Sequence, residues 1–256
     1  NASGQANHWF SPRDLSITAW ENLTAWDLVA VESDGKAYKT VRISSAEAQL
    51  STITWLDTST TLRNIKNIYL SDDKVAVLYK KVADNKVYGS IVTWSRWTPT
   101  IWTEQVISWA MVATAWFDAV ALSSSLFVVS YEIAADSKAY STACSVSWTT
   151  ITAWTEKKIT DLAVWWDVEV FCTKLSATAF VVGYQDNFSR DPYLNACTIS
   201  GTTITAWADT QVSWVTSWGT CLPVYISDLV AGVFFDDWTN QKYLPITVSG
   251  TTNCTY

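Results

Sequence analysis

The stretch Tyr140-Ser-Thr-Ala-Cys-Ser-Val-Ser147 decides the fold, because it returns 53 residues later as Tyr193-Leu-Asn-Ala-Cys-Thr-Ile-Ser200. After one further residue, both copies continue into the same six residues, Thr-Thr-Ile-Thr-Ala-Trp. Related copies begin at Tyr38, Tyr88 and Tyr243, so the successive tyrosines are 50, 52, 53 and 50 residues apart. A period of about 40–50 residues is typical of propeller blades.

Each repeat predicts the same series of strands and turns. An apolar strand such as Phe127–Tyr131 precedes a polar turn such as Asp136-Ser-Lys138, and the tyrosine segment follows as the next strand. A second turn leads to a further strand, and one more strand lies between consecutive repeats. Helical periodicity is absent. We therefore predict an all-β chain, folded as a single five-bladed β-propeller of four-stranded antiparallel blades, and the alternative is four blades plus an irregular cap.

The two ends of the chain suggest how the ring closes. Ile17-Thr-Ala-Trp-Glu21 is similar to the segment 151–156, which ends a blade, and the sequence stops at Tyr256 where the last copy of that segment is due. We expect pairing of the N- and C-terminal strands to complete one blade, which removes the free sheet edge. The expected organisation is a flexible segment 1–8 and a propeller over 9–256, with blade ends near residues 53, 101, 152, 204 and 253.

Composition excludes several classes of function. The net charge is −7 over 256 residues, which disfavours nucleic-acid partners, and no run of 18 apolar residues predicts membrane insertion. His8 is the single histidine, so a Ser-His-Asp device or a histidine-based zinc site is not expected. We predict no catalytic residues, no metal and no cofactor. The 5 cysteines contain no C-x-x-C pattern and are interpreted as small buried apolar residues.

The chain has 17 tryptophans and only 8 glycines, an inversion of the usual abundance. Trp148, Gly201 and Gly250 occupy one slot of the frame Ser-x-Thr-Thr, where a tight turn needs a positive φ that glycine adopts freely. Some bacterial lineages and their phages read the UGA codon as glycine. Our hypothesis is that most tryptophans stand where the natural protein has glycine, a reading that UGG codons at these positions would refute. The alternative is that they are stacking platforms for sugars between blades.

Polar turns before the tyrosines are the candidate ligand-binding residues. The richest are the turns at 186–191 and 236–240, whose amide, guanidinium and carboxylate groups suit sugar hydroxyls. The predicted ligand-binding residues are Asp186, Asn187, Arg190, Asp191, Asp236, Asp237 and Asn240. The same residue types are also ordinary in any hairpin turn. A glycoside hydrolase would need two carboxylates, and the candidates near the inner strands are Asp118, Asp167 and Glu169. The simpler explanation of these acids is that they occupy exposed positions of a strand.

The phrase Phe127-Val-Val-Ser-Tyr-Glu132, followed by Ala139-Tyr140 and Ser147-x-Thr-Thr-Ile-Thr152, has a twin over residues 180–205. This phrase resembles a repeat of uncharacterised bacterial and phage surface proteins, over residues 60–253, and more loosely the five-bladed lectin-like propellers. The resemblance implies a propeller in an extracellular, cell-surface or virion setting, and it carries no site residue.

We predict a non-enzymatic protein that binds glycans or another cell-surface ligand through loops on one face. A structural propeller of a phage tail or bacterial surface protein is the alternative, and a glycoside hydrolase of the five-bladed type is the second alternative. The ligand and the oligomeric state stay open.

Overall fold

The computed structural model describes residues 29–31, 37–39, 62–95, 98–164, 170–212, 221–227, 230–237, 240–249 and 253–255. These residues form strands and turns and contain no helix. The chain forms two compact units, Asn1–Thr58 and Ser59–Tyr256. In the first, β1 (Val29–Val31) pairs antiparallel with β2 (Ala37–Lys39). The prediction of an all-β chain with antiparallel sheets is confirmed.

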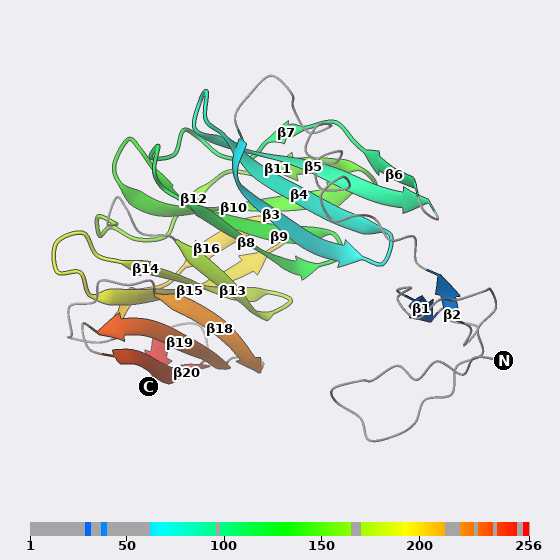
Figure 1. Ribbon diagram of the computed structural model, residues 1–256. Coiled ribbons are helices and arrows are strands. Elements are labelled where there is room, and N and C mark those ends of the chain that lie inside the picture. The colour runs from blue at the N-terminus through cyan, green and yellow to red at the C-terminus, as the bar shows by residue number, and fades with distance from the viewer. Residues whose placement is uncertain are drawn as a thin grey trace. The chain divides into compact units, whose positions relative to one another are not determined.

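The second unit contains four antiparallel sheets, each with its strands in chain order (Figure 1). Sheet I consists of β3 (Leu62–Ser71), β4 (Lys74–Lys81), β5 (Lys86–Ser95) and β6 (Thr98–Ile101), with β7 (Gln105–Val106) paired to β5. Sheet II consists of β8 (Phe117–Ser123), β9 (Leu126–Ile133), β10 (Lys138–Ser147) and β11 (Thr150–Ala153), with β12 (Lys157–Lys158) paired to β10.

Sheet III consists of β13 (Phe171–Ser176), β14 (Ala179–Gln185), β15 (Pro192–Ser200) and β16 (Thr203–Ala206), with β17 (Thr210–Gln211) paired to β15. Sheet IV consists of β18 (Leu222–Ser227), β19 (Val230–Asp237), β20 (Asn240–Ser249) and β21 (Asn253–Thr255). The first strands of successive sheets contact one another: β3 contacts β8, β8 contacts β13, and β13 contacts β18. Each sheet therefore packs against the next along the chain.

The apolar second strands hold the sheets together. On β9, Phe127, Val129 and Tyr131 belong to the core between sheets I and II, whereas Val128 belongs to the core between sheets II and III. Successive side chains of a strand point to opposite faces, so one apolar strand supplies both cores. A third core between sheets III and IV includes Val181 of β14.

The four described cysteines, Cys144, Cys172, Cys197 and Cys221, are buried free thiols. Burial raises the pKa of the Cys221 thiol to about 12, so it stays protonated at neutral pH. Their interpretation as small buried apolar residues is confirmed.

Two turn positions recur with a left-handed backbone. In the turn between the second and third strands, Asn85, Ser137 and Arg190 have φ of 57°, 52° and 60°. In the turn between the third and fourth strands, Trp148 has φ of 55° and Gly201 has φ of 61°. The shared slot therefore needs a positive φ, as the comparison of repeats predicts; Gly250 lies outside the described residues.

Replacement of Trp148 by glycine should stabilise the protein. A left-handed backbone costs a bulky residue about 1–2 kcal/mol, and glycine offsets part of that gain through its greater freedom in the unfolded chain. We expect Trp148→Gly to raise the free energy of unfolding by about 0.5–1 kcal/mol in urea melts.

Trp154 supplies the matched control, because its φ is not positive and its indole N–H donates to Ser145 Oγ at 2.9 Å. Trp154→Gly should lower the free energy of unfolding. Equal effects of the two substitutions would contradict the role of φ.

Candidate functional site

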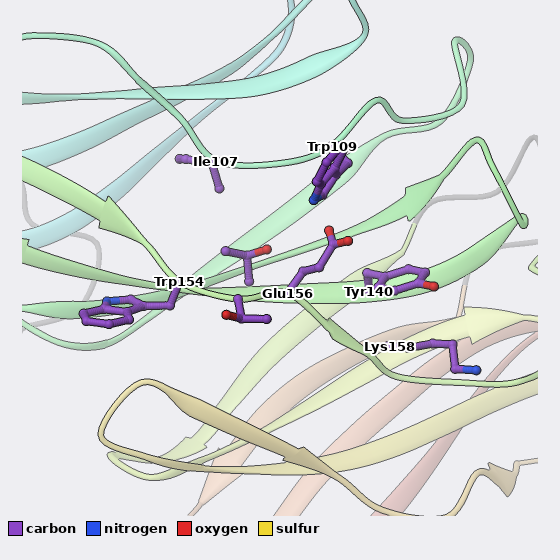
Figure 2. Close-up of a pocket in the computed structure, with 8 residues that line it drawn as sticks. Ile107, Trp109, Tyr140, Trp154, Glu156 and Lys158 are labelled. Atoms are coloured by element: carbon purple, nitrogen blue, oxygen red, sulfur yellow. The ribbon is translucent and has the colours of Figure 1, made fainter.

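A pocket of about 560 Å³ lies between the end of sheet I and the outer part of sheet II (Figure 2). Ile107 and Trp109 enter it from the segment after β7, Tyr140 and Thr142 from β10, and Lys158 from β12. The segment between β11 and β12 completes the lining with Trp154, Thr155 and Glu156. The pocket thus combines side chains from two successive repeats.

Two tryptophans give the pocket its aromatic surface. Trp109 is 68% exposed and Trp154 is 46% exposed, so both rings are accessible to a ligand. The hydrogen bond from the Trp154 indole to Ser145 fixes the orientation of that ring. Neither residue has a positive φ, unlike Trp148. The positive φ that favours glycine thus distinguishes Trp148 from these two residues, and the hypothesis that most tryptophans stand where the natural protein has glycine stays a prediction.

Glu156 is the one carboxylate in the pocket lining. Its Oε2 accepts a hydrogen bond from the Tyr131 hydroxyl at 2.9 Å, and that hydroxyl lies 2.7 Å from Thr142 Oγ1. The carboxylate points toward Trp109 (Figure 2). Partial burial raises the pKa of Glu156, and the Tyr131 hydrogen bond opposes that shift. The ionised group presents an acceptor beside the aromatic rings.

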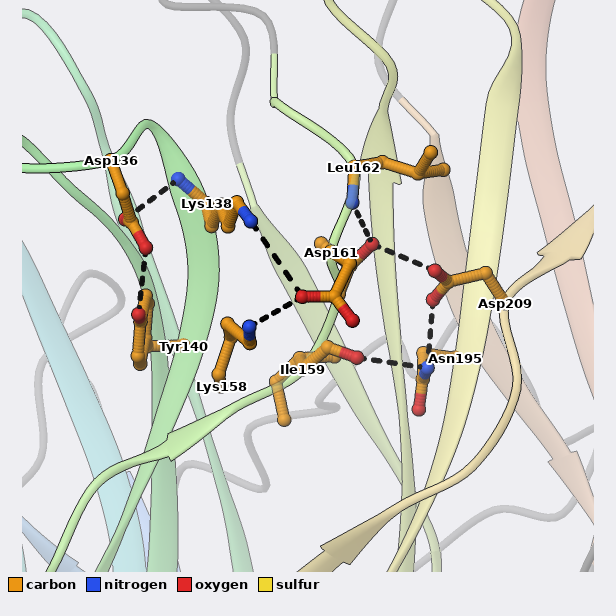
Figure 3. Close-up of polar contacts among 10 residues, drawn as sticks. Asp136, Lys138, Tyr140, Lys158, Ile159, Asp161, Leu162, Asn195 and Asp209 are labelled. Atoms are coloured by element: carbon orange, nitrogen blue, oxygen red, sulfur yellow. Dashed lines mark hydrogen bonds and ion pairs between the residues drawn. The ribbon is translucent and has the colours of Figure 1, made fainter.

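Charged side chains at the rim of the pocket are paired with one another. Lys158 forms an ion pair with Asp161, and Lys138 Nζ lies 3.6 Å from the same carboxylate (Figure 3). The Tyr140 hydroxyl donates to Asp136 Oδ2 at 2.8 Å. These contacts orient Tyr140 and Lys158 at the pocket.

The Tyr131–Glu156 pair belongs to a pattern that recurs in three sheets. Tyr79 donates to Glu104 in sheet I, and Tyr184 donates to Asp209 in sheet III. Our sequence analysis did not identify these acids. A signal for them is present, because each acid ends a Trp-x-acid triplet: Trp102-Thr-Glu104, Trp154-Thr-Glu156 and Trp207-Ala-Asp209.

The predicted ligand-binding turn at 186–191 makes hydrogen bonds mainly within its own hairpin. Asp186 Oδ2 accepts from the Ser189 amide at 2.7 Å and from its hydroxyl at 2.8 Å. Asp191 Oδ2 accepts from Gln211 Nε2 at 2.7 Å. The Asn187 amide donates to the Ala163 carbonyl at 2.7 Å, and Arg190 provides the left-handed position of the turn. Both aspartates are buried, while Phe188 at the tip is 99% exposed.

The second predicted turn connects β19 and β20. Asp237 is opposite Asn240 in the register, and Asp236 is opposite Gln241. The side chains of these residues lie outside the described part of the structure. The eight residues that line the pocket include none of the seven predicted ligand-binding residues, whose role stays a prediction.

The candidate acid Asp118 joins the first strands of three sheets. Its Oδ1 lies 2.9 Å from Lys66 Nζ on β3, and its Oδ2 accepts from the Cys172 amide on β13 at 3.0 Å. Both oxygens therefore serve the contact between sheets. Asp167 and Glu169 lie outside the described residues.

Among the described residues, histidine, cysteine and acidic side chains form no group of three or more arranged to hold a metal ion. The same residues include no helix with the length and apolar character needed to cross a membrane.

No protein-family model and no curated protein matches the chain. The solved structures that align with part of this chain include the following three. A mutant of AofleA from Arthrobotrys oligospora has 7% identity and a TM-score of 0.38, over 78% of this chain and 74% of that one. The Hadza microbial sialidase Hz136 has 8% identity and a TM-score of 0.43, over 73% and 44%. The fucose-specific lectin from Aleuria aurantia has 14% identity and a TM-score of 0.42, over 70% and 57%. These values assign no family and no function.

Outside the pocket, one strand position carries a buried polar side chain in three successive sheets. Lys80 on β4 donates to the carbonyls of Val112, Ala113 and Ala115 at 2.7, 2.9 and 3.0 Å. Gln185 on β14 donates to the Arg190 carbonyl at 3.0 Å. Glu132 on β9 is fully buried, and neither of its carboxylate oxygens has a hydrogen-bond partner.

Burial raises the pKa of Glu132 to about 8, against the opposing effect of the Lys80 ammonium. The unfolded chain releases this proton near the ordinary pKa of a glutamate, 4.5, so the folded state binds the extra proton between the two pKa values. Stability therefore falls as the pH rises from about 4.5 to about 8.

Glu132→Gln should remove this loss of stability, because glutamine resembles the protonated acid and does not ionise. We expect the free energy of unfolding of the variant to exceed that of the parent by an amount that grows from pH 5 to pH 8. For one proton this difference grows by at most about 1.4 kcal/mol for each pH unit. Urea melts at a series of pH values measure it. Asp73→Asn changes the charge equally at an exposed turn and serves as control. A stability difference for Glu132→Gln that is constant with pH would contradict this explanation.

Proposed function

We propose that the chain is a non-enzymatic carbohydrate-binding protein that holds one sugar ring in the pocket formed by Trp109, Trp154 and Glu156. The observation that carries this proposal is a carboxylate that points toward the accessible indole of Trp109, in a pocket that the accessible Trp154 also lines (Figure 2). Aromatic faces suit the apolar face of a pyranose, and a carboxylate accepts hydrogen bonds from its hydroxyls. Pockets for small ligands have volumes of about 300–1,000 Å³, and this one lies within that range.

The pocket favours binding over hydrolysis. Most glycosidases place two carboxyl groups about 5–9.5 Å apart on either side of the scissile bond. Glu156 has no acidic partner in the lining, and Asp118 is engaged between strands. A binding role also fits an extracellular, cell-surface or virion location, which we propose with it.

The expected affinity of a single ring is low. At about 0.3 kcal/mol per non-hydrogen atom, a methyl glycoside of about 13 such atoms gains about 4 kcal/mol, which corresponds to a Kd near 1 mM. Useful binding then needs longer glycans or several copies of the protein.

A glycan array, followed by titration calorimetry with the best ligand, tests the proposal. Trp109→Ala removes a stacking platform and Glu156→Gln removes a charged acceptor, so each should weaken binding by about tenfold or more. Trp148→Ala is the matched control, because this indole is 85% exposed and lies outside the pocket.

The same array decides between the alternatives. Absence of bound glycan, or equal binding by the Trp109 and Trp148 variants, would contradict the pocket and favour a structural propeller. Release of free sugar from bound oligosaccharides would contradict the non-enzymatic role.

We also propose that the repeats form one five-bladed propeller, closed by pairing of the N- and C-terminal strands. In sheets I to III the repeat tyrosine lies opposite a tyrosine of the second strand, and in the first unit Tyr38 lies opposite Ala30 at the corresponding place. Sheet IV leaves large apolar side chains exposed, namely Leu222, Val224, Ile226, Phe234 and Tyr243. Such a surface is expected to be covered.

Hydrogen exchange of residues 29–39 tests this closure. In the full chain these amides should be protected, and the double variant Val224→Asp/Ile226→Asp should lose that protection. Val106→Asp, at an exposed position of sheet I, is the control. Protection that is unchanged in the double variant would contradict the closure.

A further inference from the structure

The repeated tyrosine–carboxylate pair is the same in three sheets, but the other partners of the carboxylate differ. In sheet I, Glu104 accepts from Tyr79, and its Oε1 also forms an ion pair with Lys81 Nζ at 2.7 Å. The lysine neutralises the carboxylate. The corresponding residue of sheet II is Ile133, so Glu156 receives no such ion pair.

In sheet III, the hydrogen bonds of a single asparagine, Asn195, occupy the polar groups at the position equivalent to the pocket. Asn195 Nδ2 lies 3.0 Å from the Ile159 carbonyl and 2.8 Å from Asp209 Oδ1, and it also contacts the Trp207 carbonyl. Asn195 Oδ1 accepts from the Trp207 amide at 3.1 Å. Thr160 donates to the second Asp209 oxygen at 2.8 Å (Figure 3).

The residues that Asn195 ties together are the counterparts of pocket residues. By the repeat spacing, Ile159 corresponds to Ile107, Trp207 to Trp154, and Asp209 to Glu156. Asn195 itself corresponds to Thr142. The Thr142 side chain is too short to bridge the counterparts of the Ile159 carbonyl and the Asp209 carboxylate. Its hydroxyl lies 2.7 Å from the Tyr131 hydroxyl instead.

Two further differences between the boundaries also distinguish the pocket from its counterpart in the next repeat. Ser108, the counterpart of Thr160, donates to the Trp109 carbonyl at 2.8 Å, so it leaves the Glu156 carboxylate alone. Trp109 itself is replaced at the next boundary by Asp161, which pairs with Lys158. The second boundary therefore lacks the counterpart of the Trp109 ring, and its Asp209 carboxylate is engaged by Asn195 and Thr160.

We propose that residue 142 decides whether the boundary between sheets I and II binds sugar, and that the boundary between sheets II and III does not bind it. This inference rests on the proposed carbohydrate binding. Threonine at this position leaves Glu156 available to the ligand. Asparagine at the equivalent position 195 instead forms hydrogen bonds with the Asp209 carboxylate and the neighbouring carbonyls, which are then not available to a ligand.

Thr142→Asn transfers the closed arrangement into the pocket without changing Trp109, Trp154 or Glu156. The substitution is expected to fold, because Asn195 is accommodated among the same residue types one repeat later. Native mass spectrometry of the full chain with the methyl glycosides of galactose, fucose, mannose and N-acetylglucosamine counts bound ligands. The parent chain should bind one copy of its preferred glycoside, and Thr142→Asn should lose binding by at least tenfold with an unchanged melting temperature.

Trp148→Ala, which lies outside the pocket, should bind as the parent does. Full binding by Thr142→Asn, or two or more ligands per parent chain, would overturn this inference while the carbohydrate-binding role stands. If Thr142→Asn melts earlier, titration of Trp109→Ala keeps the single site testable, since a ligand still bound with the affinity of the parent reveals a second site. Absence of binding by the parent to any glycoside or glycan would overturn both proposals.

Discussion

The packing of the apolar second strands between neighbouring sheets is the constraint on which the rest of the structure depends. Phe127 and Val129 enter the core on one side of β9, and Val128 enters the core on the other. Burial of a side chain of this size contributes about 1.5–3 kcal/mol, so these alternating residues hold sheet II between sheets I and III. Because the sheets are fixed at their centres, the ends of the outer strands meet at boundaries, and the pocket lies at such a boundary.

Function in this architecture depends on departures from the repeat. The tyrosine–carboxylate pair recurs because it satisfies a buried hydroxyl at the same place in three sheets. A carboxylate that is fully engaged in the protein cannot also accept hydrogen bonds from a ligand. Lys81 and Asn195 engage two of the three acids, and the lack of an equivalent group beside Glu156 distinguishes the pocket from the other two positions. Small differences between similar repeats therefore decide which boundary is available to a ligand.

The sequence predicts the strands well, because alternation of apolar residues and turn chemistry are local properties. Strands β10 and β15 coincide with the two most similar tyrosine segments, and the left-handed φ at Gly201 follows from the turn frame. The pocket was not predicted, because Trp109 and Tyr140 belong to different repeats and meet only through packing of the sheets. The acids of the hairpin turns were predicted to bind the ligand instead, but Asp186 accepts a hydrogen bond within the turn and Asp191 accepts one from a neighbouring strand. Residue type alone does not separate a turn-stabilising aspartate from a ligand-binding one.

Backbone conformation divides the tryptophans into two groups with different meanings. Trp148 has a positive φ in a slot that Gly201 fills elsewhere, which is the geometry expected where glycine has been exchanged. Trp102 and Trp154 share another position, where each indole N–H donates to a hydroxyl of the preceding strand at 2.9 Å. The third copy, Trp207, has a buried indole N–H without a hydrogen-bond partner, so this hydrogen bond accompanies two of the three tryptophans at the position. The backbone at Trp148 therefore favours glycine, whereas Trp154 and Trp109 of the pocket lining have no positive φ, and the hypothesis of recoded glycine stays a prediction for all of them.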